Sequence, residues 1–175
     1  MLEIKNQWRR YRREARIRSY IRNGQKPWTA GYGEFREMVV AQILSDSDLM
    51  VRFGKNDSLP ADFGYHLDER LVEFPWVFAR LEHDDGRLLD AGSALNFSYL
   101  MDYDVMIQKQ IVIYTLAPED VIKRPNISYV YGDLRNTLFH DESFDEIVCI
   151  STLEHIGMDN TMLYSSDANF EENRP

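Results

Sequence analysis

The second half of the chain contains four short apolar runs separated by polar, glycine- or proline-containing segments. The runs are residues 86–90, 110–116, 126–131 and 144–151. Their β-branched and aromatic residues are typical of strands, and the unbroken apolar stretch in the last run is typical of a strand buried on both faces of a parallel sheet. Short helical or irregular segments between the runs favour crossover connections. We therefore predict an α/β fold with a mostly parallel sheet of about four strands.

The first half of the chain predicts helices that precede this sheet. Ile4, Trp8, Tyr11 and Ala15 recur at helical spacing with arginines between them, and Gly24 ends the segment. The hydrophobic positions therefore predict a long basic helix at the N-terminus.

Further helical signals follow. A second short helix is expected over residues 35–43, and residues 45–60 have the polar, turn-rich composition of a connector. A further helix is predicted over residues 63–80, with Trp76 and Phe78 buried in the core.

The predicted domains follow from these patterns. Residues 1–60 form a basic helical appendage with its connector, residues 61–164 a ligand-binding domain, and residues 165–175 a polar tail.

A loop of small residues follows the first strand. The run that ends at Asp90 breaks at Gly92, which lacks a Cβ and lets the backbone turn tightly and approach a ligand, and Ser93 and Ala94 keep the rim low. Open α/β sheets bind their ligands beyond the carboxyl ends of their strands. The loop therefore indicates either a nucleotide-type ligand site or a tight turn without a ligand.

Four motifs in order carry a resemblance to a known family. The series LLDAGSALN, IVIYTLAPE, YVYGDLRN and FDEIVCISTLEHIGMDN resembles motifs one to four of the S-adenosylmethionine-dependent methyltransferases with a Rossmann-like sheet, in the subgroup found with bacterial surface-glycan biosynthesis. The resemblance extends over residues 65–164. It implies methyl transfer from S-adenosylmethionine to a glycan or small-molecule acceptor.

The resemblance also implies roles for individual residues. The loop after the first strand would surround the methionine part of S-adenosylmethionine, the second strand's end would face the ribose, and Asp133 would bind the adenine amine with Leu134 on the ring. Ser151 and Thr152 would lie beside the sulfonium, and Glu154 or His155 would accept the acceptor's proton. The implied cofactor-binding residues are Asp90, Ala91, Gly92, Ser93, Ala94, Thr115, Leu116, Asp133, Leu134, Ser151 and Thr152.

The chain departs from the family pattern in its cofactor loop and at the second strand. Ala94 and Asn96 stand where further glycines are usual, and Thr115 stands where an acid usually binds the ribose, with Glu119 one helical turn too late. A hydroxyl makes a weaker hydrogen bond than a carboxylate, so weak cofactor binding is expected.

The family's sheet usually continues beyond the fourth strand. The chain resembles the first half of such an enzyme, so a homodimer or a partner chain is expected to complete the sheet, whose open edge would otherwise invite pairing. The purified chain alone is expected to lack methyltransferase turnover. A non-catalytic scaffold that works through the basic helix and the sheet edge is the alternative, and a nucleotide-sugar or dinucleotide binder is a third, which Thr115 disfavours.

Charge is distributed unevenly along the chain. The net charge of the 175 residues is −9, but residues 1–26 carry nine Lys or Arg against Glu3 and Glu14, so this segment is +7 and the remainder is −16. The basic helix could lie on anionic headgroups or a phosphate-rich acceptor, or pack its aromatic stripe on the domain or a partner. The acidic remainder and the lack of a reader motif disfavour nucleic acid.

The cysteine and histidine positions argue against a disulfide-stabilised protein and against a metal-binding protein. Cys149 is the only cysteine, which excludes a disulfide framework and predicts a core thiol in a reducing cytoplasm. The four histidines are scattered, so no metal site is expected. No apolar run approaches the roughly 18 residues of a membrane span, and the expected location is the cytoplasm, with peripheral contact at the inner membrane through the basic helix.

Overall fold

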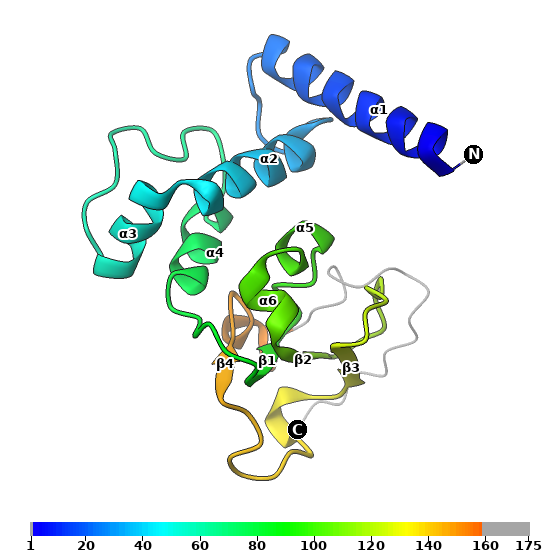
Figure 1. Cartoon of the computed structure of the whole chain (residues 1–175), viewed down its shortest axis with the longest axis vertical. Coiled ribbons are helices and arrows are strands. Elements are labelled where there is room, and N and C mark those ends of the chain that lie inside the picture. Colours follow the sequence, from blue (N-terminus) through cyan, green and yellow to red (C-terminus); the bar gives the residue numbers. More distant parts are fainter. Residues whose placement is uncertain (1, 159–175) are drawn as a thin grey trace. The chain divides into compact units, whose positions relative to one another are not determined.

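The computed structural model describes residues 2–158, with side chains from residue 7 onwards. The chain divides into two compact units, residues 1–80 and residues 81–175 (Figure 1). The division falls after Arg80 and not at residue 60, because the helix that precedes the first strand packs with the other helices. The predicted tail, residues 165–175, lies outside the described residues.

The first unit is helical. Its elements are α1 (Leu2–Arg22), α2 (Tyr32–Ser45), α3 (Ser47–Lys55) and α4 (Arg70–Phe78). Helix α2 contacts each of the other three helices (Figure 1). The hydrophobic core between them is formed by Ile17, Tyr20, Tyr32, Val40, Ile43, Phe53, Leu71, Phe74, Val77 and Phe78.

Residues 45–60 were predicted to form a polar connector, and that prediction is wrong, because helix α3 lies within them. The Asp46 carboxylate accepts hydrogen bonds from the amides of Asp48 and Leu49, both at 3.0 Å, and so caps the helix start. Asn56 ends the helix in the left-handed conformation with φ of 56°. Polar caps at both ends gave the segment its loop-like composition, while Phe53 between them is buried.

Trp76 was predicted to be buried with Phe78, and only Phe78 is. Trp76 is 46% exposed. Its indole N–H donates to Asn56 Oδ1 at 3.3 Å, and the Arg80 guanidinium lies 3.9 Å from its ring centroid. An indole combines apolar area with a polar N–H, so the rim of the unit satisfies it better than the core.

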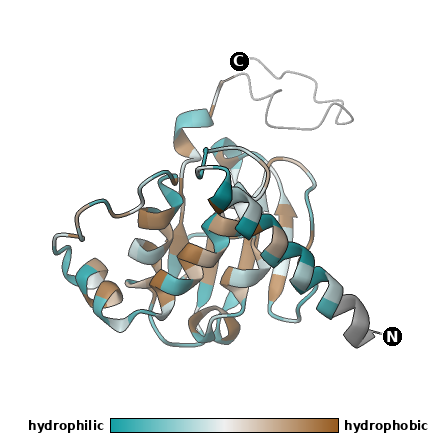
Figure 2. Ribbon diagram, turned by 90° about the horizontal axis from the view of Figure 1, so that it is seen from above, coloured by the Kyte–Doolittle hydropathy of each residue, from teal (hydrophilic) through white to brown (hydrophobic). Residues whose placement is uncertain are grey.

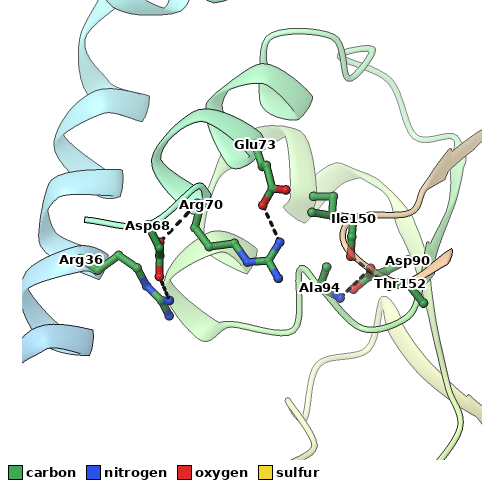
Figure 3. A network of polar contacts seen from close by, with 8 residues as sticks. All are labelled: Arg36, Asp68, Arg70, Glu73, Asp90, Ala94, Ile150 and Thr152. Atoms are coloured by element: carbon green, nitrogen blue, oxygen red, sulfur yellow. Dashed lines mark hydrogen bonds and ion pairs between the residues drawn. The ribbon is translucent and has the colours of Figure 1, made fainter. Parts of the chain in front are cut away.

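A polar cluster ties α2 to the segment before α4. The Arg36 guanidinium contacts the Asp68 carboxylate at 2.6 Å, and Asp68 is only 5% exposed (Figure 3). Burial, followed by hydrogen bonding to Asp68, raises the pKa of Tyr32 to about 12. The neutral phenol is therefore the form that the folded unit holds.

We expect the free energy of unfolding of the helical unit to fall as the pH rises from about 10 towards 12. In that window the unfolded Tyr32 loses its proton while the folded one keeps it, and each pH unit then removes at most about 1.4 kcal/mol. Denaturant unfolding followed by tryptophan fluorescence measures this, since all three tryptophans lie in residues 1–80. Tyr32→Phe should flatten the pH dependence, and the exposed control Tyr65→Phe should not; identical slopes in all three proteins would contradict the assignment.

The second unit is an α/β layer structure, as predicted. Its strands are β1 (Arg87–Ala91), β2 (Gln110–Thr115), β3 (Ile127–Tyr131) and β4 (Glu146–Val148), all parallel and in the order β3-β2-β1-β4. Helices α5 (Ser98–Met101) and α6 (Asp104–Gln108) connect β1 to β2 on one side of the sheet (Figure 1). Two short 3-10 helices, η1 (Leu134–Asn136) and η2 (Leu153–His155), follow β3 and β4.

One face of the sheet is covered without an α-helix. On one face Leu89, Ala91 and Tyr114 form a buried cluster. The partly buried residues that pack on this cluster are Val112, Val130, Leu134, Phe139 and Phe144. The short 3-10 helix η1 and the irregular segment after it, rather than an α-helix, therefore contribute to the cover of that face.

Strand β4 is shorter than predicted and is not buried on both faces. Ile147 lies beside the buried Leu89 in the strand register, yet it is 65% exposed. Cys149, expected to be a core thiol, is exposed as well. In the described residues β4 has a neighbouring strand only on the β1 side, and the cluster around Leu89 does not extend over it, so alternate side chains face outward.

Candidate functional site

The carboxyl ends of the four strands meet at one edge of the sheet, and the strand order reverses at β1. The chain passes from β1 to β2 and β3 on one side and then returns to place β4 on the other side of β1. The loops after β1 and β4 therefore leave the sheet side by side and lead in opposite directions. In open α/β sheets this switch point is where ligands bind.

The Asp90 side chain accepts hydrogen bonds from backbone amides of the loop that follows β1. The residue is fully buried, its Oδ1 accepts a hydrogen bond from the Ala94 amide at 3.1 Å, and its Oδ2 accepts one from the Leu95 amide at 2.9 Å (Figure 3). A buried carboxylate stabilised by two backbone N–H groups holds the loop in a single conformation. The contact with a ligand's ammonium group that the sequence predicts for Asp90 stays a prediction.

Gly92 brings the β1 and β4 loops into direct contact. Its φ is 108°, and its amide donates to the Tyr114 carbonyl at 2.8 Å. A Cβ at this position would lie 2.0 Å from Thr152 Oγ1 and 2.7 Å from Thr152 Cβ. Glycine is therefore required here both by the backbone conformation and by the approach of Thr152.

The residues on either side of this contact are also conformationally special. Ser93 and Ser151 have positive φ values of 63° and 47°. The Thr152 hydroxyl donates to the Ile150 carbonyl at 2.9 Å, which orients the threonine (Figure 3). Non-glycine residues in the left-handed region are uncommon and cluster at functional sites.

The Ser93 hydroxyl is a polar group without a partner in the described part of the chain. Its oxygen is inaccessible to solvent and makes no hydrogen bond with another described residue. A buried hydroxyl is normally hydrogen-bonded, so a ligand for which the loop opens would gain a hydrogen bond from Ser93.

A hydrogen-bond chain that the sequence analysis missed ties this loop to the segment after β2. The Tyr129 hydroxyl donates to Asn96 Oδ1 at 2.7 Å and accepts from the Ile122 amide at 2.8 Å. The Asn96 amide group also donates to the Asp120 carbonyl at 2.9 Å. Asn96 therefore has a structural role in holding this loop, and an amide side chain in a loop of mainly small residues was the available signal.

The end of β2 has one hydroxyl group, that of Thr115, which could bind a ligand. Thr115 is half-buried, and its hydroxyl donates at 3.4 Å to the Ala117 carbonyl, at the long limit for such a bond. Leu116 is half-buried beside it. The Thr115 hydroxyl is therefore only weakly held and can turn to another acceptor.

Asp133 lies at the end of β3 in an ion pair with Arg135. Its carboxylate accepts from the Arg135 amide at 2.8 Å and from the guanidinium nitrogens Nε and Nη2 at 2.9 Å and 2.7 Å. These hydrogen bonds hold the pKa of Asp133 below its ordinary value. The carboxylate is 36% exposed, so a ligand could reach it in competition with Arg135.

The backbone around Asp133 is fixed by Tyr114. The Tyr114 hydroxyl donates to the Asp133 carbonyl at 3.1 Å, and a Cβ on Gly132 would lie 2.3 Å from that hydroxyl oxygen. Leu134, predicted to pack on an adenine ring, lies partly against the core cluster of Leu89 and Tyr114. Its side chain thus borders both the core and the sheet edge.

Glu154 and His155 lie in η2, directly after Thr152. Glu154 is exposed and His155 is half-buried, and the His155 amide donates to the Thr152 carbonyl at 3.0 Å. The pKa of the nearby Cys149 thiol is raised, first by desolvation and also by the charges of Asp90 and Glu154. The thiol is therefore protonated near neutral pH and is a poor nucleophile.

The structure thus brings some predicted site residues together. The Asp90–Ala94 loop contacts Thr152 through Gly92, whereas Asp133 is positioned by Tyr114 and Arg135. In the described range no group of three or more His, Cys, Asp or Glu side chains is arranged to hold a metal, and no helix is long and apolar enough to cross a membrane.

Comparison with known proteins adds no relative. No family model, no curated protein and no solved structure matches this chain.

Proposed function

We propose that the α/β unit binds S-adenosylmethionine and belongs to a methyltransferase, as the enzyme or as its cofactor-binding half, that acts on a glycan or small-molecule acceptor. The observation that supports this most is the contact of Gly92 with Thr152 at the point where the strand order reverses. In open α/β sheets ligands bind at that point, and the resemblance of the four motifs to those of methyltransferases favours the nucleoside cofactor S-adenosylmethionine. The proposal extends to a second chain that completes the sheet.

The groups at the sheet edge match the chemistry of this cofactor. The Ser93 hydroxyl lacks a partner among the described residues and would bind a polar atom of the methionine part. The Asp133 carboxylate would accept a hydrogen bond from the adenine amine. For this, the Arg135 guanidinium would have to release one of the two Asp133 carboxylate oxygens. Because Thr115 replaces an acid, we expect the affinity to be weak.

The reaction itself needs mainly positioning. When bound, S-adenosylmethionine would supply an activated methyl group, whose carbon would bond to a nucleophilic atom of the acceptor as its bond to sulfur breaks and the electron pair stays on sulfur. The acceptor's proton would pass to Glu154 or His155, which follow Thr152 in η2. Exposed groups contribute little without an acceptor held in line with the methyl group.

Calorimetric titration with S-adenosylhomocysteine tests the proposal. We expect weak binding, a loss of about 10-fold in affinity for Asp133→Asn, and no change for the exposed control Glu119→Gln. The asparagine keeps an oxygen that can cap η1. Arg135→Gln should leave the affinity unchanged or raise it, because it frees the carboxylate.

Two results would count against the methyltransferase proposal. One is no heat at millimolar ligand, and the other is equal affinity of Asp133→Asn and the unchanged chain. The first result would favour the alternative of a non-catalytic scaffold, which the 65% exposure of Ile147 on β4 supports, because an apolar side chain at a sheet edge suits a protein contact.

A further inference from the structure

Helix α1 is strongly basic along its whole length. Its 21 residues include eight Lys or Arg against two Glu. The coloured part of α1 is mainly teal and white in Figure 2. This charge lies outside the site at the sheet edge, and the proposed methyl transfer does not use it.

One side of α1 packs against α2 in the helical unit. Ile17 and Tyr20 are buried, and the Tyr20 ring packs on Tyr32 and Phe35 of α2. Two ion pairs reinforce this side: Arg13 with Glu37 at 3.4 Å and Arg16 with Glu34 at 2.9 Å. Aromatic packing and these pairs hold the C-terminal half of α1 on α2.

The opposite side of α1, which we call the outer face, carries exposed aromatic and basic residues. At 100° per residue, Trp8, Tyr11, Arg12 and Arg22 lie on the side away from Ile17 and Tyr20. Trp8 is 59% exposed and Tyr11 is 60% exposed, and their rings form an edge-to-face pair 6.3 Å apart. The aromatic stripe is therefore exposed at these two positions.

The charges of the outer face are only partly neutralised within the described part of the chain. Arg12 and Arg22 form no ion pair with another described side chain, whereas Arg10 and Arg18 both contact Glu14. Two guanidinium groups without an ion pair therefore share this face with an exposed tryptophan and tyrosine: Arg12 directly follows Tyr11, and Arg22 lies at the C-terminal end of the helix.

We propose that the outer face of α1 binds the surface of a membrane rich in anionic phospholipids. The arginines attract the lipid phosphates, and the rings of Trp8 and Tyr11 enter the headgroup layer, where one edge of each ring stays polar. Trp8 and Tyr11 are the large apolar side chains on this face among those that the structure describes, and the face is otherwise basic, so we expect α1 to lie in the plane of the surface.

A lipid surface suits this face better than nucleic acid does. The rest of the chain carries −16 and would repel a long polyanion that wraps around it. A flat surface needs to meet only one helix face, because charges more than about 8 Å away are screened at physiological salt. The exposed tryptophan and tyrosine are also the residue types that gather at membrane interfaces.

The test is co-sedimentation of the full chain with vesicles. Vesicles of phosphatidylcholine with a third of phosphatidylglycerol should bind the chain, pure phosphatidylcholine should not, and high salt should release it. Arg12→Gln/Arg22→Gln should lower the partition coefficient about 30-fold. The matched control Arg9→Gln/Arg10→Gln removes the same charge from the other side of the same helix and should lower it much less.

A spectroscopic measurement identifies the contact face independently. In a Trp28→Phe/Trp76→Phe background Trp8 is the only tryptophan, and its emission should shift to the blue with anionic vesicles alone. Circular dichroism checks that each variant keeps its helices. Equal losses in the two arginine pairs, no shift of Trp8, or binding to a DNA duplex without binding to vesicles would overturn the proposal.

Discussion

Gly92→Ala is expected to abolish detectable binding of S-adenosylhomocysteine. The backbone at Gly92 has φ of 108°, and the added methyl group would lie 2.7 Å from Thr152 Cβ, which no side-chain rotation can move away. The β1 and β4 loops must therefore separate, and backbone strain alone costs about 1–3 kcal/mol. Calorimetric titration of folded protein, checked by circular dichroism, measures the loss.

Two further variants show whether the close approach of Thr152 is the cause. Gly157→Ala has the same kind of strain, with φ of 82°, but its Cβ would meet no atom within 4 Å, so binding should persist. Adding Thr152→Gly to Gly92→Ala removes the clashing Cβ and should restore part of the affinity. Unchanged binding by Gly92→Ala would show that the ligand site lies elsewhere.

Lys109→Met is expected to destabilise the α/β unit by about 3–5 kcal/mol. Lys109 is fully buried directly before β2, and its Nζ contacts Asp84 at 2.7 Å and Glu146 at 2.5 Å. Burial alone would lower the pKa of Lys109, but hydrogen bonds to Asp84 and Glu146 outweigh it and raise the pKa. Methionine fills similar space and leaves the Glu146 carboxylate, which is 18% exposed, without its cation.

Hydrogen exchange of peptides from β1 and β2 measures this effect. Tryptophan fluorescence would report only on residues 1–80, where all three tryptophans lie. Lys123→Met, which removes an exposed lysine of the same unit, should leave the exchange unchanged. Adding Glu146→Gln to Lys109→Met should recover part of the protection, and full protection in Lys109→Met alone would show that the buried triad contributes no stability.

Local patterns were sufficient to predict the strands. Four apolar runs became four parallel strands, because a β-branched run between chain-breaking residues has few other ways to bury its side chains. The turn at Gly92 was equally readable, since a glycine after a buried strand allows the positive φ that the structure has there.

Other features depended on partners distant in sequence. The position of Cys149 in an apolar run predicted burial, but nothing in that run states that β4 has a strand on one side only among the described residues. Likewise Lys109 reads as a surface lysine until Asp84 and Glu146 are brought to it from other strand ends.

The sequence by itself determined the class of the fold, the strand segments and the concentration of basic charge in the first helix, because these depend on spacing and composition within short windows. Only the tertiary structure decided that Thr152 lies against Gly92, that Asp90 is occupied by the amides of its own loop, and that Trp8 and Tyr11 are exposed. The physical reason is that contacts and burial depend on which surfaces pack against each other. A pattern of hydrophobic positions is compatible with several packing arrangements and does not select one of them.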